Sequence, residues 1–104
     1  MKALYTIALC LFTTVAFAGE AVWIDVRTPA EYAAGHKDDA QNIPHDVIGE
    51  RIAALKLSKD ADIMLYCRSG KRAGMAQSTL NGMGYQHVTN VGGLADALKY
   101  QSAE

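Results

Sequence analysis

Four short apolar or extended runs divide the chain. AVWIDV at 21–26 and IMLYC at 63–67 are continuous runs rich in β-branched and aromatic side chains, which is typical of buried strands. HVTNV at 87–91 has the composition of a third strand, and AQNIP at 40–44 is a brief extended segment that a proline ends. Continuous rather than strictly alternating runs favour strands that are covered on both sides.

Helical patterns lie between these runs. Thr28, Pro29 and Glu31 form the pattern of an N-cap, a first helical residue and a capping box, so a short helix is expected to begin there and to end at Gly35. Three later helices are expected from apolar residues at helical spacing: Ile48, Ile52 and Leu55 within 46–57, Ala73, Ala76, Leu80 and Met83 before a stop at Gly84, and the inward-facing Leu94 and Leu98 within 94–100.

The alternation of strands and helices predicts an α/β fold, a three-layer domain in which helices cover both faces of a parallel sheet. Ligands of such sheets bind beyond the carboxyl ends of the strands. Cys67 is the last residue of the most continuous strand, and a helix follows it closely. We therefore expect Cys67 at the edge of the sheet where a ligand binds.

The first 18 residues have a different pattern. MKALYTIALCLFTTVAFA has a lysine near its start, a short apolar run and small residues at its end, which is the layout of a cleaved secretory signal. A buried N-terminal helix and a membrane anchor are the alternatives, but the run is shorter than the ~20 apolar residues that a stable span needs. We expect cleavage after Ala18, one domain over 19–104, a periplasmic location and no stable membrane anchor.

Composition limits the partners and the cysteine chemistry. The formal net charge is −1 over 104 residues, so nothing in the charge points to nucleic acid. Cys10 lies in the signal segment, which leaves Cys67 as the single thiol of the exported domain. It can form no internal disulfide, although export into an oxidising compartment usually goes with paired cysteines. Cys67 therefore needs another explanation.

The five residues after this cysteine suggest one; they are Arg68, Ser69, Gly70, Lys71 and Arg72. A glycine-containing turn from a strand into a helix directs backbone N–H groups inward and forms an anion-binding nest at the helix N-terminus. The helix end and the three cations favour the thiolate, so we expect the pKa of Cys67 to be lowered. The pattern predicts a nucleophilic cysteine that attacks an anionic substrate.

Other interpretations of this cysteine fit less well. Buried structural thiols favour apolar surroundings rather than a cationic glycine loop. His36, His45 and His87 are scattered without metal-ligand spacing, so no metal site is expected. Nothing in the sequence places one of them as the base of a Cys–His hydrolase, although proximity in space stays open. Cysteine-dependent phosphatases place five residues between cysteine and arginine, whereas four separate Cys67 from Arg72.

The motifs together resemble a known family. WIDVRTPAEYAAGH at 23–36, AQNIP at 40–44, YCRSGKRAGMA at 66–76 and GYQHVTNVGGL at 84–94 look like the successive motifs of single-domain rhodaneses, which are thiosulfate sulfurtransferases. The sequence is most similar to the small exported rhodaneses of the bacterial phage-shock type. Taken alone, the DVR motif at 25–27 and the GG motif at 92–93 are weak evidence for the family. Four motifs in order around a CxxGxR loop are specific, and they cover nearly all of 19–104.

The resemblance implies a rhodanese-like fold and a ping-pong reaction. The Cys67 thiolate takes the outer sulfur of thiosulfate as a persulfide and releases sulfite, and a thiophilic acceptor such as cyanide or a thiol then removes that sulfur. Backbone N–H groups from Arg68 to Arg72 are expected to hold the persulfide, while the cations Arg68, Lys71 and Arg72 attract the thiosulfate. The resemblance calls for no metal or organic cofactor, and we expect a monomer.

The sequence departs from the family pattern at three positions. Lys37 stands where an apolar residue is usual and Asp39 where glycine is usual, which predicts a polar rim that faces solvent. Ala73 stands where many relatives have serine, so one hydrogen bond at the start of the helix is expected to be missing.

Nearby residues outside the loop are expected to be structural. Arg27 and Glu31 lie four residues apart around a helix start, a spacing that suits an ion pair. Asp25 is expected to be a satisfied buried polar group, and Trp23 to lie in the core.

Two other functions stay open beside the enzyme. One is a carrier or binding module that holds a persulfide for a protein partner and turns over slowly. The other is a redox-sensing thiol that oxidises and pairs with another chain. A preformed anion cradle favours the enzyme over the sensor, because sensing needs no such cradle.

Overall fold

A computed structural model of the protein describes residues 20–100. In chain order, the elements are β1 (Val22–Asp25), α2 (Pro29–Ala34), β2 (Gln41–Asn42), α3 (Ile48–Arg51), the 3-10 helix η1 (Ile52–Leu55), β3 (Asp62–Cys67), α4 (Lys71–Gly82), β4 (His87–Gly93) and α5 (Leu94–Lys99). The expected signal segment lies outside the described residues. Within 20–100, none of the helices has the length and apolar character needed to cross a membrane.

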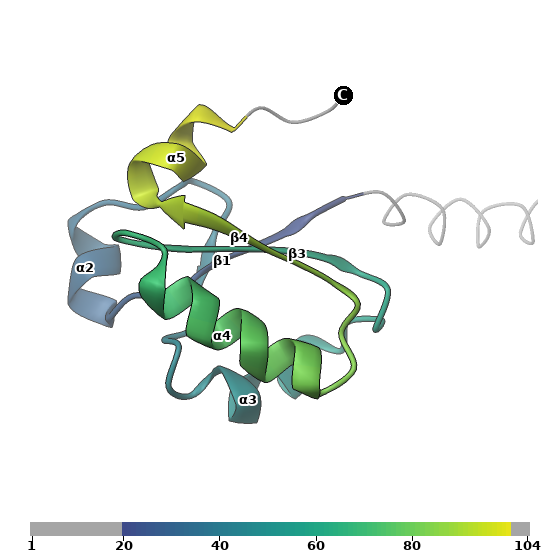
Figure 1. Cartoon of the computed structure of the whole chain (residues 1–104). Coiled ribbons are helices and arrows are strands. Elements are labelled where there is room, and N and C mark those ends of the chain that lie inside the picture. The colour runs from purple at the N-terminus through teal and green to yellow at the C-terminus, as the bar shows by residue number, and fades with distance from the viewer. Residues whose placement is uncertain (1–19, 101–104) are drawn as a thin grey trace, which may run out of the picture.

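The four strands form one parallel sheet in the order β2-β1-β3-β4. Figure 1 shows this sheet almost edge-on, with α3 and α4 against one face and α5 against the other. The predicted three-layer α/β fold is therefore confirmed. Because β3 lies between β1 and β4, its last residue, Cys67, stands at the carboxyl edge in the middle of the sheet.

Each face of the sheet has its own apolar core. The larger core lies under α3, η1 and α4 and is formed by Ile24, Val26, Ile43, Ile48, Ile52, Ile63, Leu65, Cys67, Ala73, Ala76, Leu80 and Tyr85. The smaller core lies under α5 and is formed by Trp23, Ala40, Met64, Tyr66 and Ala97. Alternate residues of one strand supply the two cores, as the period of two in a strand requires. Trp23 is in the core as expected.

The start of α2 follows the sequence pattern. The Glu31 N–H donates to Thr28 Oγ1 at 3.2 Å, and the Thr28 N–H donates to Glu31 Oε1 at 3.0 Å, so both halves of the capping box are formed. Pro29 occupies the first helical position, where its missing N–H costs nothing. The helix ends at Ala34, before Gly35, as predicted.

The single helix expected over 46–57 is divided in two. α3 is followed at once by the 3-10 turns of η1, and Lys56 ends them with a left-handed backbone at φ 54°. Ile48 and Ile52 are fully buried, so the apolar spacing was interpreted correctly. The apolar spacing does not predict that the backbone hydrogen bonds change from the α-helical i+4 pattern to the 3-10 i+3 pattern after Arg51.

Two residues expected to face inward do not. Met83 is 38% exposed, because α4 ends at Gly82 and Met83 lies outside its helical periodicity. Leu98 is 59% exposed, whereas Ala97 is fully buried. α5 packs on the sheet through the small Ala97. The face of the helix that contains Leu94 and Ala97 therefore faces the sheet, and Leu98 lies at the border of that face.

Asp25 and Arg27 form a buried ion pair at the carboxyl end of β1. Asp25 is fully buried and accepts from Arg27 Nε at 2.9 Å and from Nη2 at 2.6 Å, and Arg27 Nη2 also donates to Gly35 O at 2.7 Å. The expected Arg27–Glu31 pair is therefore wrong. Arg27 precedes the N-cap of α2, so the spacing of helical ion pairs does not apply to it.

Removal of the Asp25 charge tests the weight of this buried pair. Asp25→Asn leaves the Arg27 guanidinium buried without a counter-charge, and we expect it to lower the free energy of unfolding by about 3 kcal/mol in urea titrations. Asp39→Asn is the matched control, because Asp39 pairs with Lys37 while 63% exposed, and its expected cost is below about 0.5 kcal/mol. Equal effects of the two variants would contradict this assignment.

Candidate active site

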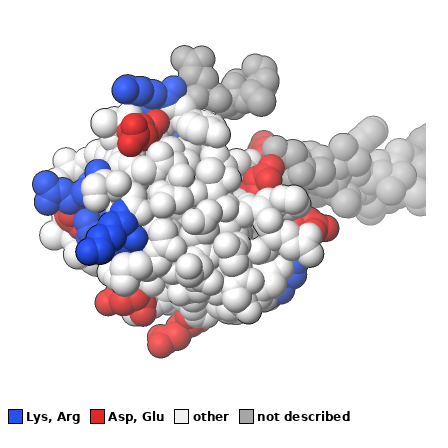
Figure 2. All heavy atoms as spheres, in the orientation of Figure 1, with Lys and Arg blue, Asp and Glu red and all other residues white. Residues whose placement is uncertain are grey.

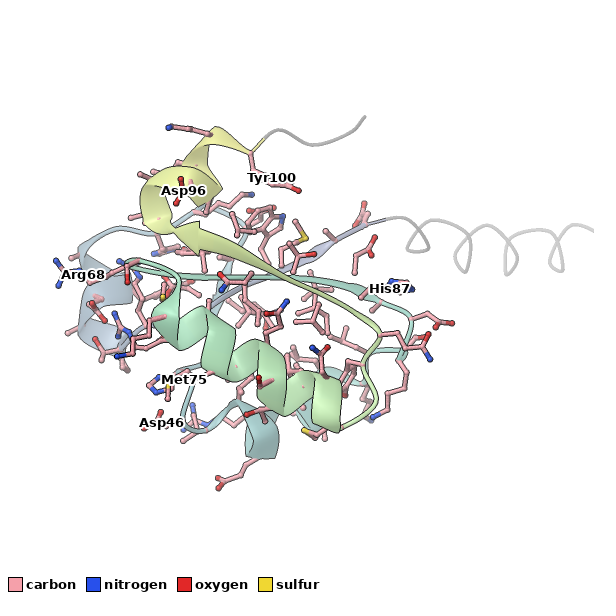
Figure 3. All side chains as sticks on the ribbon, viewed as in Figure 1. Asp46, Arg68, Met75, His87, Asp96 and Tyr100 are labelled. Atoms are coloured by element: carbon pink, nitrogen blue, oxygen red, sulfur yellow. The ribbon has the colours of Figure 1, made fainter. Side chains whose placement is uncertain are left out.

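The loop after β3 turns within three residues into α4. Gly70 is the N-cap of α4 and has a φ of 101°, a conformation that residues with a side chain rarely adopt. A Cβ at Gly70 would also lie 3.3 Å from Gly92 Cα in the neighbouring strand. Figure 3 shows Arg68 at the end of the molecule where this turn lies, with its side chain directed away from the ribbon. The turn therefore requires glycine for both its backbone angle and its space.

The Cys67 sulfur lies inside this turn, at the N-terminus of α4. Cys67 is 1% exposed, and the Gly70 N–H donates to its Sγ at 3.0 Å. Burial acts to raise the pKa of the Cys67 thiol, but hydrogen bonds from the backbone N–H groups of the turn more than offset it and leave the pKa lowered. The donors are those of Ala73, Gly70, Ser69 and Arg72.

The lowered pKa agrees with the sequence analysis, but its cause differs in emphasis. Fixed backbone donors hold the sulfur, whereas the loop cations were expected to contribute strongly. The Ala73 N–H, outside the range from Arg68 to Arg72, belongs to the cradle as well. α4 has no side-chain N-cap, so the sulfur occupies the position where a capping oxygen would accept these N–H groups.

The three loop cations have different surroundings. Arg72 is half-buried and donates from Nη1 to Glu31 Oε1 at 2.9 Å and from Nη2 to Oε2 at 3.1 Å. Arg68 is 75% exposed, with Nε 3.9 Å from Glu31 Oε2, and Lys71 is exposed. Figure 2 shows cationic side chains gathered at this end of the molecule, with an acidic group among them. Positive charge therefore surrounds the mouth of the cradle, while the donors that contact sulfur are backbone groups.

β4 braces the loop from the side, and the sequence analysis missed this. Asn90 Nδ2 donates to Gly70 O at 2.9 Å, while Asn90 Oδ1 accepts from the Gly92 N–H at 3.0 Å. A Cβ added to Gly93 would collide with the Arg68 carbonyl oxygen, so strand and loop touch backbone to backbone. The only sequence feature that could have indicated this contact is Asn90, two residues before the glycine pair, and apolar periodicity does not assign a role to such a residue.

The contacts of His36 and Lys37 are with residues other than Cys67. The His36 ring stacks on Tyr32 at a centroid distance of 3.6 Å, and its Nδ1 lies 2.8 Å from Tyr32 O. Lys37 Nζ lies 4.2 Å from the centroid of the Trp23 ring, and the side chain of Lys37 is 17% exposed. The expected solvent-facing rim is therefore right for the exposed Asp39 and wrong for Lys37, whose stem covers the smaller core.

Within residues 20–100, no three His, Cys, Asp or Glu side chains are grouped so that they could hold a metal ion. In the same range, every buried side-chain nitrogen or oxygen has a hydrogen-bond partner. The groups that the structure places at this edge are a thiol with a lowered pKa, backbone donors and three surrounding cations.

A parallel sheet with a cysteine cradle at the N-terminus of a helix is the arrangement that the sequence predicted. Comparison with known proteins agrees with it: the sequence matches the rhodanese-like domain over residues 16–98, so the chain belongs to this family. The resemblance and the fold expected from the sequence are thereby confirmed.

Two curated relatives indicate which members of the family the chain resembles. The chain is 43% identical over 95 residues to the thiosulfate sulfurtransferase PspE of Escherichia coli K12, an alignment covering 91% of this chain and 89% of PspE. It is 41% identical over 70 residues to a sulfurtransferase of Allochromatium vinosum, covering 67% of this chain and 64% of that protein.

Solved structures show the same fold. A rhodanese with anions from E. coli has a TM-score of 0.71 at 43% identity, and the match covers 74% of this chain and 91% of that one. The human single-domain sulfurtransferase TSTD1 has a TM-score of 0.68 at 26% identity, covering 90% and 95%. The roles of Cys67 and its loop in this chain remain predictions from the residues and their geometry.

The backbone donors predict how Cys67 titrates. Thiolate absorbance in the ultraviolet, corrected with Cys67→Ala, should rise at a lower pH in the folded protein than in protein unfolded by urea, because only the fold gathers the N–H donors on the sulfur.

The same shift has a consequence for stability. A pKa that folding lowers contributes stability that is present above the pKa of the unfolded thiol and is lost as the pH falls through the folded pKa. The stability of the wild type relative to Cys67→Ala should therefore increase from pH 6 to pH 9. A constant difference would contradict the assigned cause.

The contact between β4 and the loop predicts a second effect. Gly93→Ala places a methyl group against the Arg68 carbonyl, so the loop must move and the donors lose their alignment on sulfur. We expect the thiol pKa to return toward the unfolded value and transfer of sulfur to fall by up to ~10²-fold. Gly82→Ala is the matched control, since no atom lies within 4 Å of the added Cβ, and it should leave both quantities unchanged.

Proposed function

We propose that the protein is a thiosulfate sulfurtransferase that works through a Cys67 persulfide. The observation that carries the proposal is the buried Cys67 sulfur at the start of α4, which accepts from the Gly70 N–H at 3.0 Å and whose pKa the backbone N–H groups of the turn lower. A persulfide is an anion at the terminal sulfur, and fixed donors in a water-poor site stabilise such a charge without reorganisation. The similarity to PspE over most of both chains supports thiosulfate as the donor.

In the first step, the Cys67 thiolate attacks the outer sulfur of thiosulfate. A bond forms between Sγ and that sulfur, and the S–S bond of thiosulfate breaks. The electron pair of the broken bond leaves with sulfite, and Cys67 carries a persulfide anion. No general base takes part, because the lowered pKa supplies the thiolate before the donor arrives.

In the second step, a thiophilic acceptor attacks the terminal sulfur of the persulfide. The bond between Sγ and that sulfur breaks, and its electron pair returns to Sγ as the thiolate. Cyanide leaves as thiocyanate, and a thiolate acceptor leaves as a persulfide. The backbone donors of the turn face Sγ in the resting form, and we expect the same donors to hold the terminal sulfur of the loaded form.

Two features of the environment of Cys67 favour sulfur transfer over redox sensing. The side chain is almost fully buried, which hinders a second protein chain from reaching Sγ more than it hinders a small anion. The exposed cations Arg68 and Lys71 attract small anions to the same edge of the sheet. A carrier that passes its persulfide to a protein partner uses the same cradle, and the rate of turnover separates it from the enzyme.

The proposal extends to the location and the assembly. Residues 1–18 have the layout of a cleaved signal, which supports export to the periplasm as a domain that begins at Gly19. A cradle completed by residues of one chain supports action as a monomer, since β3, the loop, α4, α2 and β4 of the same chain supply the sulfur and the groups around it.

Intact mass spectrometry tests this function. Protein purified from the periplasm should begin at Gly19, gain the mass of one sulfur atom on incubation with thiosulfate, and lose it again on addition of cyanide. Cys67→Ala should gain nothing. Steady formation of thiocyanate at rates above those of Cys67→Ala completes the expected result.

The other outcomes identify the alternatives. A stable gain of sulfur with slow release to cyanide would indicate a persulfide carrier. No gain, together with an intermolecular disulfide under mild oxidation, would replace the sulfurtransferase with a thiol sensor.

A further inference from the structure

Glu31 is the acidic group that lies among the loop cations. It comes from α2, 41 residues before Arg72, so only the fold brings the two side chains together. Both of its oxygens accept from Arg72, and Arg68 Nε lies 3.9 Å from Oε2. One carboxylate therefore faces two of the three cations that surround the cradle.

The Glu31 carboxylate is also held in place from its other side. Oε1 accepts from the Thr28 N–H at 3.0 Å and from Thr28 Oγ1 at 3.1 Å. Hydrogen bonds from Arg72 and then from Thr28 lower the pKa of Glu31 to about 2. The negative charge is thus fixed in position and present throughout the pH range in which the protein works.

Arg72 is the cation that this charge affects most. Its side chain is 26% exposed, against 75% for Arg68, and the Cys67 thiolate is near enough to contribute to the raised pKa of Arg72, after the hydrogen bond and charge of Glu31. A bidentate guanidinium–carboxylate pair uses the face of Arg72 that would otherwise bind two oxygens of an oxyanion. An oxyanion that binds Arg72 through this face must therefore compete with Glu31.

We propose that Glu31 is a specificity-determining residue that competes with anionic ligands for Arg72 and so limits the affinity of the cradle for dianions. This inference rests on the proposed function, since it concerns how thiosulfate binds and how sulfite leaves. Arg68 and Lys71 attract the donor to the edge of the sheet, and Glu31 prevents Arg72 from retaining the anion that the reaction releases. Weak binding of the product permits the next turnover.

The variant Glu31→Gln tests the charge with little change of shape. Its amide oxygen can still accept from Thr28, so the capping box is kept. We expect the KM for thiosulfate and the inhibition constant of sulfate, an inert dianion, to fall ~3- to 10-fold, the range expected for removing one partly solvated charge a few ångströms from the ligand. Glu20→Gln, the same change in an exposed residue before β1 at the opposite edge of the sheet, should alter neither constant.

A second measurement does not depend on turnover. The rate of alkylation of Cys67 by the anion iodoacetate, divided by the rate with neutral iodoacetamide, reports the potential at the sulfur. The ratio should rise about threefold in Glu31→Gln and stay constant in Glu20→Gln. If the wild type transfers no sulfur from thiosulfate, the proposed function fails, yet this ratio still decides the role of Glu31.

Two further variants separate charge from structure. Thr28→Ala weakens the cap of α2 but keeps the Glu31 charge, so a merely structural role predicts that it reproduces the effects of Glu31→Gln, whereas our proposal predicts an unchanged ratio. Arg72→Gln leaves Glu31 unpaired and should lower the ratio below that of the wild type. Adding Glu31→Gln to Arg72→Gln should restore it. An unchanged or lowered ratio in Glu31→Gln, or a KM that rises, would overturn the proposal.

Discussion

The interaction between the sulfur of Cys67 and the backbone N–H groups at the start of α4, with the Gly70 N–H donating at 3.0 Å, is the one on which the rest of the site depends. A helix N-terminus needs acceptors, and a thiolate needs donors, so each satisfies the other. This explains why α4 begins without a polar cap in its own sequence. It also explains why a buried cysteine acquires a lowered pKa, although burial alone acts in the opposite direction.

The surrounding elements hold that bond in place from three sides. β4 fixes the turn through Asn90 and the close approach of Gly93 to the loop. α2 holds Arg72 through Glu31. On the opposite face of the sheet, the Asp25–Arg27 pair ties the end of β1 to the end of α2 at Gly35. One face of the sheet thus carries the reactive sulfur, and on the other face a buried ion pair stabilises the same carboxyl edge.

The sequence correctly predicted the features that depend only on residues close together along the chain. The strand that ends at Cys67, the capping box of α2 and the turn through Gly70 each follow from a few neighbouring residues. The ion pairs did not. Arg27 lies before the N-cap of α2, so helical spacing does not apply to it, and it pairs with its near neighbour Asp25. Glu31 pairs with Arg72, 41 residues later, and only the fold brings them together. The exposure of Leu98 depends on how closely Ala97 approaches the sheet, which the sequence does not state. The cradle donors were predicted in kind, but the share carried by the backbone rather than by side chains depends on the folded geometry of the turn.

A sulfur in the place of a helix cap links the chemical state of one atom to the order of a whole turn. A modification that keeps negative charge near Sγ leaves the first N–H groups of α4 with an acceptor. One that removes the charge leaves these donors facing a neutral group in a buried place. We therefore expect the amide hydrogens of this turn to exchange with solvent at a rate that depends on whether the sulfur is charged or neutral.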